Sequence, residues 1–212
     1  MTAVEVFVDP SCPWAWITCQ WLREVAPARA LTLTWRSYCM EIRDDYDVAP
    51  TMPAERRDTA LAAHAVSHRM LRIFEAARAS AGESAVDALF AAWGPLFFVH
   101  DRPADAVLLG KCIAASGLDA DLVRAADDET WDTPIVQSMD IAYAFGGVKT
   151  QTPTIVVRAD PPYGFKGPVM APAPKGDAAR LWDAVQVLAQ EPGFFEITRP
   201  RVNRPRVSHP SA

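Results

Sequence analysis

The sequence has few cysteines and no long hydrophobic run, and each shortage excludes a class of protein. Four cysteines in 212 residues are too few for the disulfide scaffold of a small secreted protein. No run approaches the roughly 18 consecutive apolar residues of a membrane helix. The first residues lack the basic and apolar segments of a signal peptide. We therefore expect a cytoplasmic protein with no membrane partner.

An excess of basic charge is also missing from most of the chain. The net charge is −5, from 21 basic and 26 acidic side chains. Residues 199–212 contain four of the arginines and no acid, so the rest of the chain is acidic, which argues against nucleic acid as the main partner. His64 and His68 have the spacing of a metal-binding pair, but no third ligand is evident. We expect no metal cofactor.

Strand patterns at the two ends of the chain enclose a helical middle. β-Branched and aromatic residues predict strands at 3–8, 31–38, 152–157 and 163–166. Helical periodicity predicts a helix that begins at Ser11 as N-cap and ends at Pro27, and a last helix over 177–190. Between them, helices are expected at 55–79, 84–93, 104–115, 120–126 and 133–145. A sheet split by a helical insertion is the simplest arrangement.

Cys12 lies where a thiol becomes reactive, between a strand and the start of a helix. The unpaired N–H groups and the positive dipole end of a helix favour the thiolate, which is the nucleophile. Lowering the pKa by two units requires ~2.7 kcal/mol, whereas the dipole supplies ~0.3–1 kcal/mol and at most ~2 kcal/mol. Pro13 has no N–H, so hydrogen bonds from the amides of Trp14 and Ala15 must supply the rest.

Several motifs together resemble one family. They are Asp9-Pro10-Ser11-Cys12-Pro13-Trp14, Trp16-Ile17-Thr18, Trp21, Thr152-Pro153-Thr154, Phe165-Lys166-Gly167-Pro168-Val169-Met170 and Gly193-Phe194-Phe195-Glu196. The set resembles the DsbA-like branch of the thioredoxin superfamily, and more narrowly the actinobacterial mycothiol-dependent nitroreductase and oxidoreductase group. The resemblance covers both ends of the chain, and the helical middle matches only in plan and at His100.

The resemblance implies an α/β fold, a thioredoxin-like domain with an inserted all-helical domain. The expected domains are 1–52 with 147–198, the insertion at 53–146, and a flexible basic tail at 199–212. It also implies that Thr152 and a cis Pro153 face Cys12 and offer backbone to the substrate. The expected catalytic residues are Cys12, Pro13, Trp14 and Ala15, and the expected substrate-binding residues are Thr152, Pro153, His100 and Trp21.

The position that holds a second cysteine in dithiol members of this family is Ala15. Cys19 is seven residues from Cys12, a helical rise of ~10.5 Å, whereas disulfide-bonded Cα atoms lie within ~6.8 Å. Whether Cys39 lies near the site stays open. We therefore predict a monothiol enzyme that uses mycothiol or glutathione as its small thiol.

Its expected partners are that thiol and a disulfide or an electrophilic small molecule. The absence of the second cysteine weakens the expectation of nitroreductase-like activity. Two alternatives are a kappa-type glutathione transferase or isomerase, and a redox-inactive binding protein with the same fold. Whether the protein forms a homodimer is left open.

Overall fold

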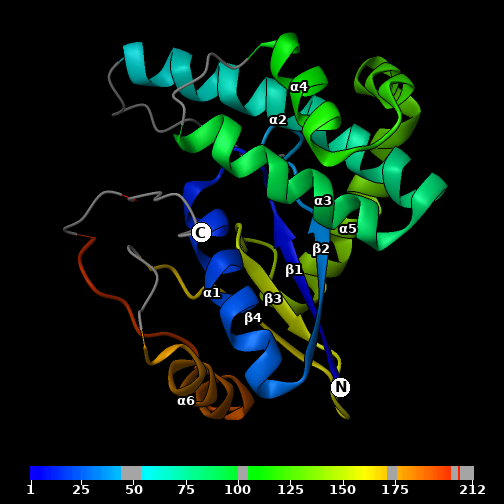
Figure 1. The fold of residues 1–212 in the computed structure, drawn as a ribbon. Coiled ribbons are helices and arrows are strands. Elements are labelled where there is room, and N and C mark those ends of the chain that lie inside the picture. The colour runs from blue at the N-terminus through cyan, green and yellow to red at the C-terminus, as the bar shows by residue number, and fades with distance from the viewer. Residues whose placement is uncertain (44–53, 100–104, 171–175, 202–204, 206–212) are drawn as a thin grey trace. The chain divides into compact units, whose positions relative to one another are not determined.

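The computed structural model describes residues 1–43, 54–99, 105–170, 176–201 and 205, and the chain forms two compact units (Figure 1). Unit 1 comprises Met1–Val8, Cys12–Arg36 and the described residues from Ile141 onward, and unit 2 comprises Asp9–Ser11 and the described part of Ser37–Asp140. The predicted boundary at residue 52 lies outside the described residues, as does most of the tail at 199–212, so the domain limits stay a prediction.

Unit 1 is built on a four-stranded sheet of β1 (Thr2–Val8), β2 (Leu31–Ser37), β3 (Thr154–Val157) and β4 (Tyr163–Lys166). The strand order is β2-β1-β3-β4. Strand β3 runs antiparallel to both neighbours, with Ile155 opposite Val6 on β1 and Phe165 on β4. All four residues of β3 are buried, as expected of a short continuous apolar run in the centre of a sheet. The predicted strands are therefore present.

Helix α1 (Pro13–Arg29) connects β1 to β2, and its two ends differ from the prediction. Its N-cap is Cys12, in extended conformation, rather than Ser11, because the Cys12 sulfur accepts the amide N–H of Ala15. Pro13 occupies the first turn, where its missing N–H costs nothing. Pro27 does not end the helix; it removes one hydrogen bond of the last turn, and the chain leaves the helix only at Ala30, with φ +50°.

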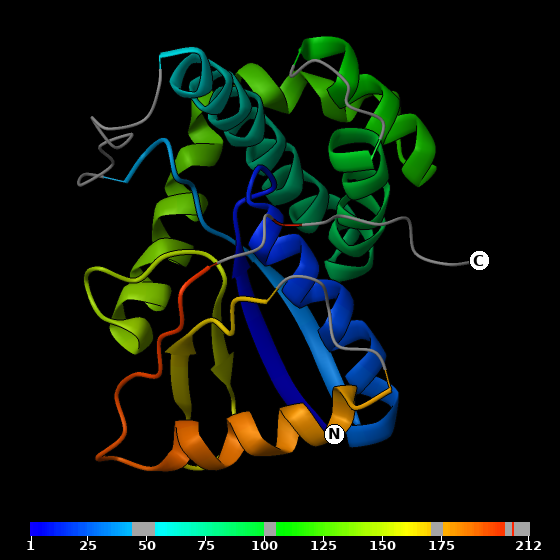
Figure 2. The same cartoon turned by 90° about the vertical axis from the view of Figure 1, so that its left-hand side faces the viewer.

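Helix α6 (Ala178–Gln190) lies beside the second half of α1 (Figure 2). The Trp21 indole N–H donates to the Ala178 carbonyl at 3.0 Å, and the Trp21 and Trp182 rings pack with their centroids 5.9 Å apart. Near the end of α1, the Arg29 guanidinium makes two hydrogen bonds with the Asp183 carboxylate, and these bonds hold the pKa of Asp183 below its usual value. These contacts pack the first helix of unit 1 against its last helix.

Unit 2 is helical, as the sequence predicts. It contains α2 (Ala54–Ala81), α3 (Glu83–Gly94), a π-helical turn η1 (Pro95–Val99), α4 (Ala106–Ser116), the 3₁₀ segments η2 (Ala120–Asp127) and η3 (Glu129–Trp131), and the first part of α5 (Asp132–Gly146). The residues 120–126, expected as an α-helix, form the 3₁₀ segment η2. Pro95 caps the C-terminal end of α3 and is the first residue of the π-helical turn η1, so helical backbone continues past it. No described helix is both long enough and apolar enough to cross a membrane.

A buried carboxylate fixes the turn that precedes Cys12 in sequence. Asp9 is 1% exposed, and its Oδ1 accepts the Ser11 amide at 2.8 Å and the Ser67 hydroxyl at 2.5 Å. Its Oδ2 accepts the Met40 amide at 2.8 Å, and the Trp93 indole donates to the Pro10 carbonyl at 2.8 Å. Buried polar groups need such partners, so this part of unit 2 is held in one arrangement.

Candidate active site

Cys12 stands at the head of α1, and two backbone groups of unit 1 face its sulfur. The Ala15 amide donates a hydrogen bond to Sγ at 3.5 Å. The Cys12 thiol in turn donates to the Thr152 carbonyl oxygen, which lies 3.7 Å from Sγ. The thiol form therefore has an acceptor for its proton, and the thiolate form has an N–H donor. Of the two amides expected to donate, that of Ala15 does so. The side chain is 7% exposed.

Hydrogen bonds on both sides hold the segment that faces Cys12. The Thr152 hydroxyl donates to the Phe7 carbonyl of β1 at 3.1 Å. The Pro153 carbonyl accepts the Gly167 amide, just after β4, at 2.8 Å. The Thr152–Pro153 peptide bond is cis. With Thr152 bonded to β1 and Pro153 bonded to Gly167, the Thr152 carbonyl oxygen faces the cysteine.

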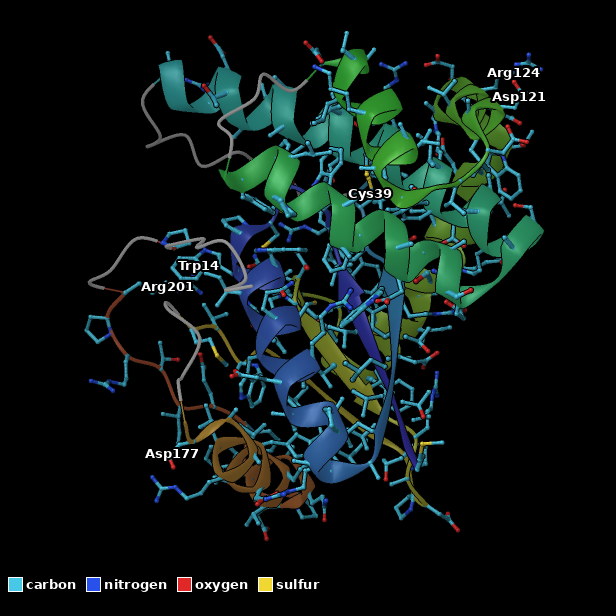
Figure 3. The ribbon with its side chains drawn as sticks, in the orientation of Figure 1. Trp14, Cys39, Asp121, Arg124, Asp177 and Arg201 are labelled. Carbon is cyan, nitrogen blue, oxygen red and sulfur yellow. The ribbon has the colours of Figure 1, made fainter. Side chains whose placement is uncertain are left out.

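The remaining residues of the first turn of α1 differ in exposure. Ala15 is fully buried, whereas Pro13 and Trp14 are half-buried. The guanidinium carbon of Arg201 lies 5.4 Å from the centroid of the Trp14 ring (Figure 3), a cation–π arrangement. The sequence places Arg201 only in the basic tail, and the cluster of four arginines at 199–212 was the one signal that pointed to it.

Of the expected binding residues, His100 lies outside the described part of the chain and Trp21 is fully buried. His100 falls among residues 100–104, outside the described part of the chain. Trp21 is 0% exposed and its indole N–H is used by Ala178. The Trp21 side chain packs α1 against α6 and has no exposed surface with which to contact a substrate.

Replacing Trp21 with alanine therefore tests packing against binding. We expect the free energy of unfolding to fall by about 3–5 kcal/mol, the usual cost of removing a buried tryptophan, and Trp21→Phe to lose less. The rate at which Cys12 reacts in the folded fraction should change by no more than about twofold. Urea unfolding and thiol-reaction rates on the same samples measure both. Unchanged stability with a slowed thiol reaction would restore the binding role.

The other three cysteines are sealed from solvent. Cys19, Cys39 and Cys112 are each 0% exposed, and none of the four cysteines forms a disulfide. Burial is the main cause that raises the pKa of Cys39, with the charge of Asp9 adding to it. Burial also raises the pKa of Cys112 to about 12, and its thiol donates to the Leu89 carbonyl at 3.3 Å. Thiols that stay protonated and covered are poor nucleophiles.

Alkylation of the native protein with iodoacetamide at neutral pH should label one cysteine, Cys12. In denaturant all four should be labelled, and peptide mapping by mass spectrometry distinguishes the sites. The Cys12→Ser variant, kept folded, should incorporate no label on the same timescale. Labelling of Cys39 or Cys112 in the native protein would contradict the burial that the structure shows.

The described residues contain no group of three or more histidine, cysteine, aspartate or glutamate side chains placed to hold a metal ion. The ring nitrogens of His68 lie 2.9 Å from Glu41 and 2.7 Å from Asp132. The Asp132 carboxylate also binds Arg72, which lowers the pKa of Asp132. His68 is thus part of a hydrogen-bond network in unit 2.

Comparison with known proteins gives a family match and several structural neighbours. Residues 11–199 match the family model described as Rv2466c-like, mycothiol-dependent nitroreductase Rv2466c. The protein Rv2286c of Mycobacterium tuberculosis is 28% identical over 204 residues, which cover 95% of this chain and 83% of that protein.

Two solved structures resemble the fold. SCO1869 of Streptomyces coelicolor, described as a probable DsbA oxidoreductase, has a TM-score of 0.61 at 19% identity, covering 99% of this chain and 97% of its own. The cytosolic disulfide reductase DsbM of Pseudomonas aeruginosa, solved with GSH, has a TM-score of 0.57 at 17% identity, covering 87% of this chain and 98% of its own. These likenesses confirm the predicted α/β thioredoxin-like fold with a helical insertion.

Proposed function

Because the chain belongs to the Rv2466c-like family of mycothiol-dependent nitroreductases, and is thus a thiol-dependent oxidoreductase, we propose that Cys12 is its single redox cysteine. A small thiol, mycothiol before glutathione, is its co-substrate. The observation that carries the proposal is the Cys12 sulfur at the N-terminus of α1, with the Ala15 amide 3.5 Å away and an alanine where a resolving cysteine would stand.

The reaction has two exchange steps. In the first, the Cys12 thiolate attacks one sulfur of a disulfide; the Cys12 S–S bond forms, the substrate S–S bond breaks, and one thiolate leaves. In the second, the thiolate of a small thiol attacks the other sulfur of that mixed disulfide and returns Cys12 as thiolate. The net change of the two steps is an exchange: one half of the substrate disulfide leaves as a thiolate, the other half leaves as a mixed disulfide with the small thiol, and the protein itself ends unchanged.

The surrounding groups serve those steps. The Ala15 N–H stabilises the Cys12 thiolate both as attacking and as leaving group. Pro13 occupies the first helical position. Thr152 and Pro153, held by Phe7 and Gly167, border the sulfur and position the attached group through backbone contacts. Trp14, half-buried in the same first turn as Cys12, is proposed as an apolar wall of the site.

The identity of the small thiol is supported by the comparisons. The matched family is described by its dependence on mycothiol, and the DsbM neighbour was solved with GSH. Both are small thiols, and a monothiol site requires one from solution. We place the protein in the cytoplasm, where such thiols are kept reduced, with a small disulfide or electrophile as its other partner.

Intact-mass spectrometry after incubation with mycothiol disulfide tests the proposal. The wild-type protein should gain one mycothiol, and Cys12→Ser should gain none. Glutathione disulfide is used in a parallel incubation, as the second candidate small-thiol disulfide. An equal adduct on Cys12→Ser, or no adduct on the wild type with either disulfide, would overturn the proposed function.

A further inference from the structure

The C-terminal segment brings a guanidinium to the edge of the proposed site. After α6 the chain runs from Glu191 without regular secondary structure to Arg201, which lies over the Trp14 ring at 5.4 Å. Figure 3 shows the two side chains next to each other, near the start of α1. Trp14 is two residues after Cys12 in the same first turn, and all three residues belong to unit 1.

Arg201 differs from several other arginines of the chain in its partners. In the described parts of the chain, Arg29, Arg72 and Arg158 each bind a carboxylate, whereas Arg201 has no acidic partner among the same residues. It is exposed to solvent. A guanidinium stacked on an aromatic ring keeps N–H donors at its rim, and these match the two oxygens of a carboxylate.

The first turn of α1 adds positive potential at the same place. Its amides form the positive end of the helix dipole, and no acidic residue stands in that turn to neutralise it. An incoming anion therefore meets a helix N-terminus together with a guanidinium that binds no carboxylate of the described residues. A neutral or cationic molecule gains nothing from either.

We propose that Arg201 is a specificity-determining residue that binds a carboxylate of the disulfide or electrophile that Cys12 attacks. The inference rests on the proposed function and names its substrate class: small molecules that carry an anionic group close to the reacting sulfur. The Trp14 ring holds the guanidinium in place and contacts the apolar part of the same molecule.

The test compares the reaction of Cys12 with three disulfides under pseudo-first-order conditions. These are dithiobis(nitrobenzoate), which carries two carboxylates, dithiodipyridine, which is neutral, and cystamine, which is cationic. Arg201→Gln should slow the reaction with dithiobis(nitrobenzoate) roughly tenfold, the effect of one charge-assisted hydrogen-bonded pair, and leave the neutral disulfide within about twofold. Arg201→Glu should slow the anionic disulfide further and accelerate cystamine, and Arg201→Lys should retain part of the wild-type preference.

Arg199→Gln is the matched control, because it removes the same charge from the same segment two residues away. It should leave the relative rates of Cys12 with the three disulfides unchanged. Added salt should reduce the anionic rate in the wild type more than in Arg201→Gln. An unchanged rate with the anionic disulfide in Arg201→Gln overturns the inference, and so does an equal change with all three disulfides, which would show a structural role. If Cys12 of the wild type reacts with none of the three, the proposed function fails instead.

Discussion

An Ala15→Cys variant is expected to form an internal disulfide with Cys12 and to expel any small thiol bound there. Residues three apart on a helix have Cα atoms about 5 Å apart, which is within the ~4.4–6.8 Å that separates the Cα atoms of a disulfide. The Ala15 amide is already 3.5 Å from the Cys12 sulfur. Because the second thiol acts intramolecularly, the mixed disulfide should disappear at least ~10²-fold faster than in the wild type without added thiol.

The measurement is intact mass against time, starting from the isolated adduct. The wild type should keep its adduct, and Ala15→Cys should lose it and end two hydrogens lighter than the reduced variant. Ala15→Ser is the control, since it adds an atom of similar size that forms no disulfide, and it should behave as the wild type. An adduct as long-lived in Ala15→Cys as in the wild type would show that the geometry at the head of α1 is different.

Cys12→Ser is expected to reduce the rate of disulfide exchange by at least ~10³-fold, because it removes the nucleophile itself. Cys19 lies in the same helix but is fully buried. The Cys19→Ala variant should therefore keep the wild-type rate of disulfide exchange when the rate is calculated per folded molecule. Turnover with mycothiol and a disulfide substrate, measured on folded samples of each variant, gives the comparison.

The same variant separates the proposed function from its alternatives. In a kappa-type transferase or isomerase the site residue stabilises a bound thiolate and forms no disulfide, so conjugation of a thiol to an electrophile would survive Cys12→Ser. In a redox-inactive binding protein, the wild type itself would form no adduct. Retained conjugation by Cys12→Ser would therefore remove the monothiol mechanism.

Much of the fold was predictable, because its elements follow local rules. The β-branched run at 152–157 and the alternation at 31–38 predict β3 and β2, and Gly117 closes α4 with φ +71°. The errors lie where two local rules compete. Ser11 is a better N-cap by composition, but the structure gives that place to Cys12. Pro27 predicts the end of the helix, but α1 continues to Arg29 because tertiary packing overrides the local preference.

The site was predictable only in part. The placement of Cys12 at a helix start follows from the sequence. The prediction that the segment at Thr152 faces Cys12 came from the family resemblance. The Arg201–Trp14 contact joins residues from opposite ends of the chain, and no periodicity or capping rule relates them. Trp21 shows the reverse case: a tryptophan near a reactive cysteine has the composition of a binding residue, and only burial reveals that it packs α6 against α1.

The most direct test follows the return of free Cys12 from the isolated mycothiol adduct at increasing concentrations of mycothiol. The monothiol account predicts a rate that rises in proportion to the thiol concentration and is close to zero without it. It also predicts that Cys19→Ala gives the same dependence, within about twofold. Release in the absence of added thiol, with an internal disulfide linking Cys12 to Cys19 or Cys39, would contradict it.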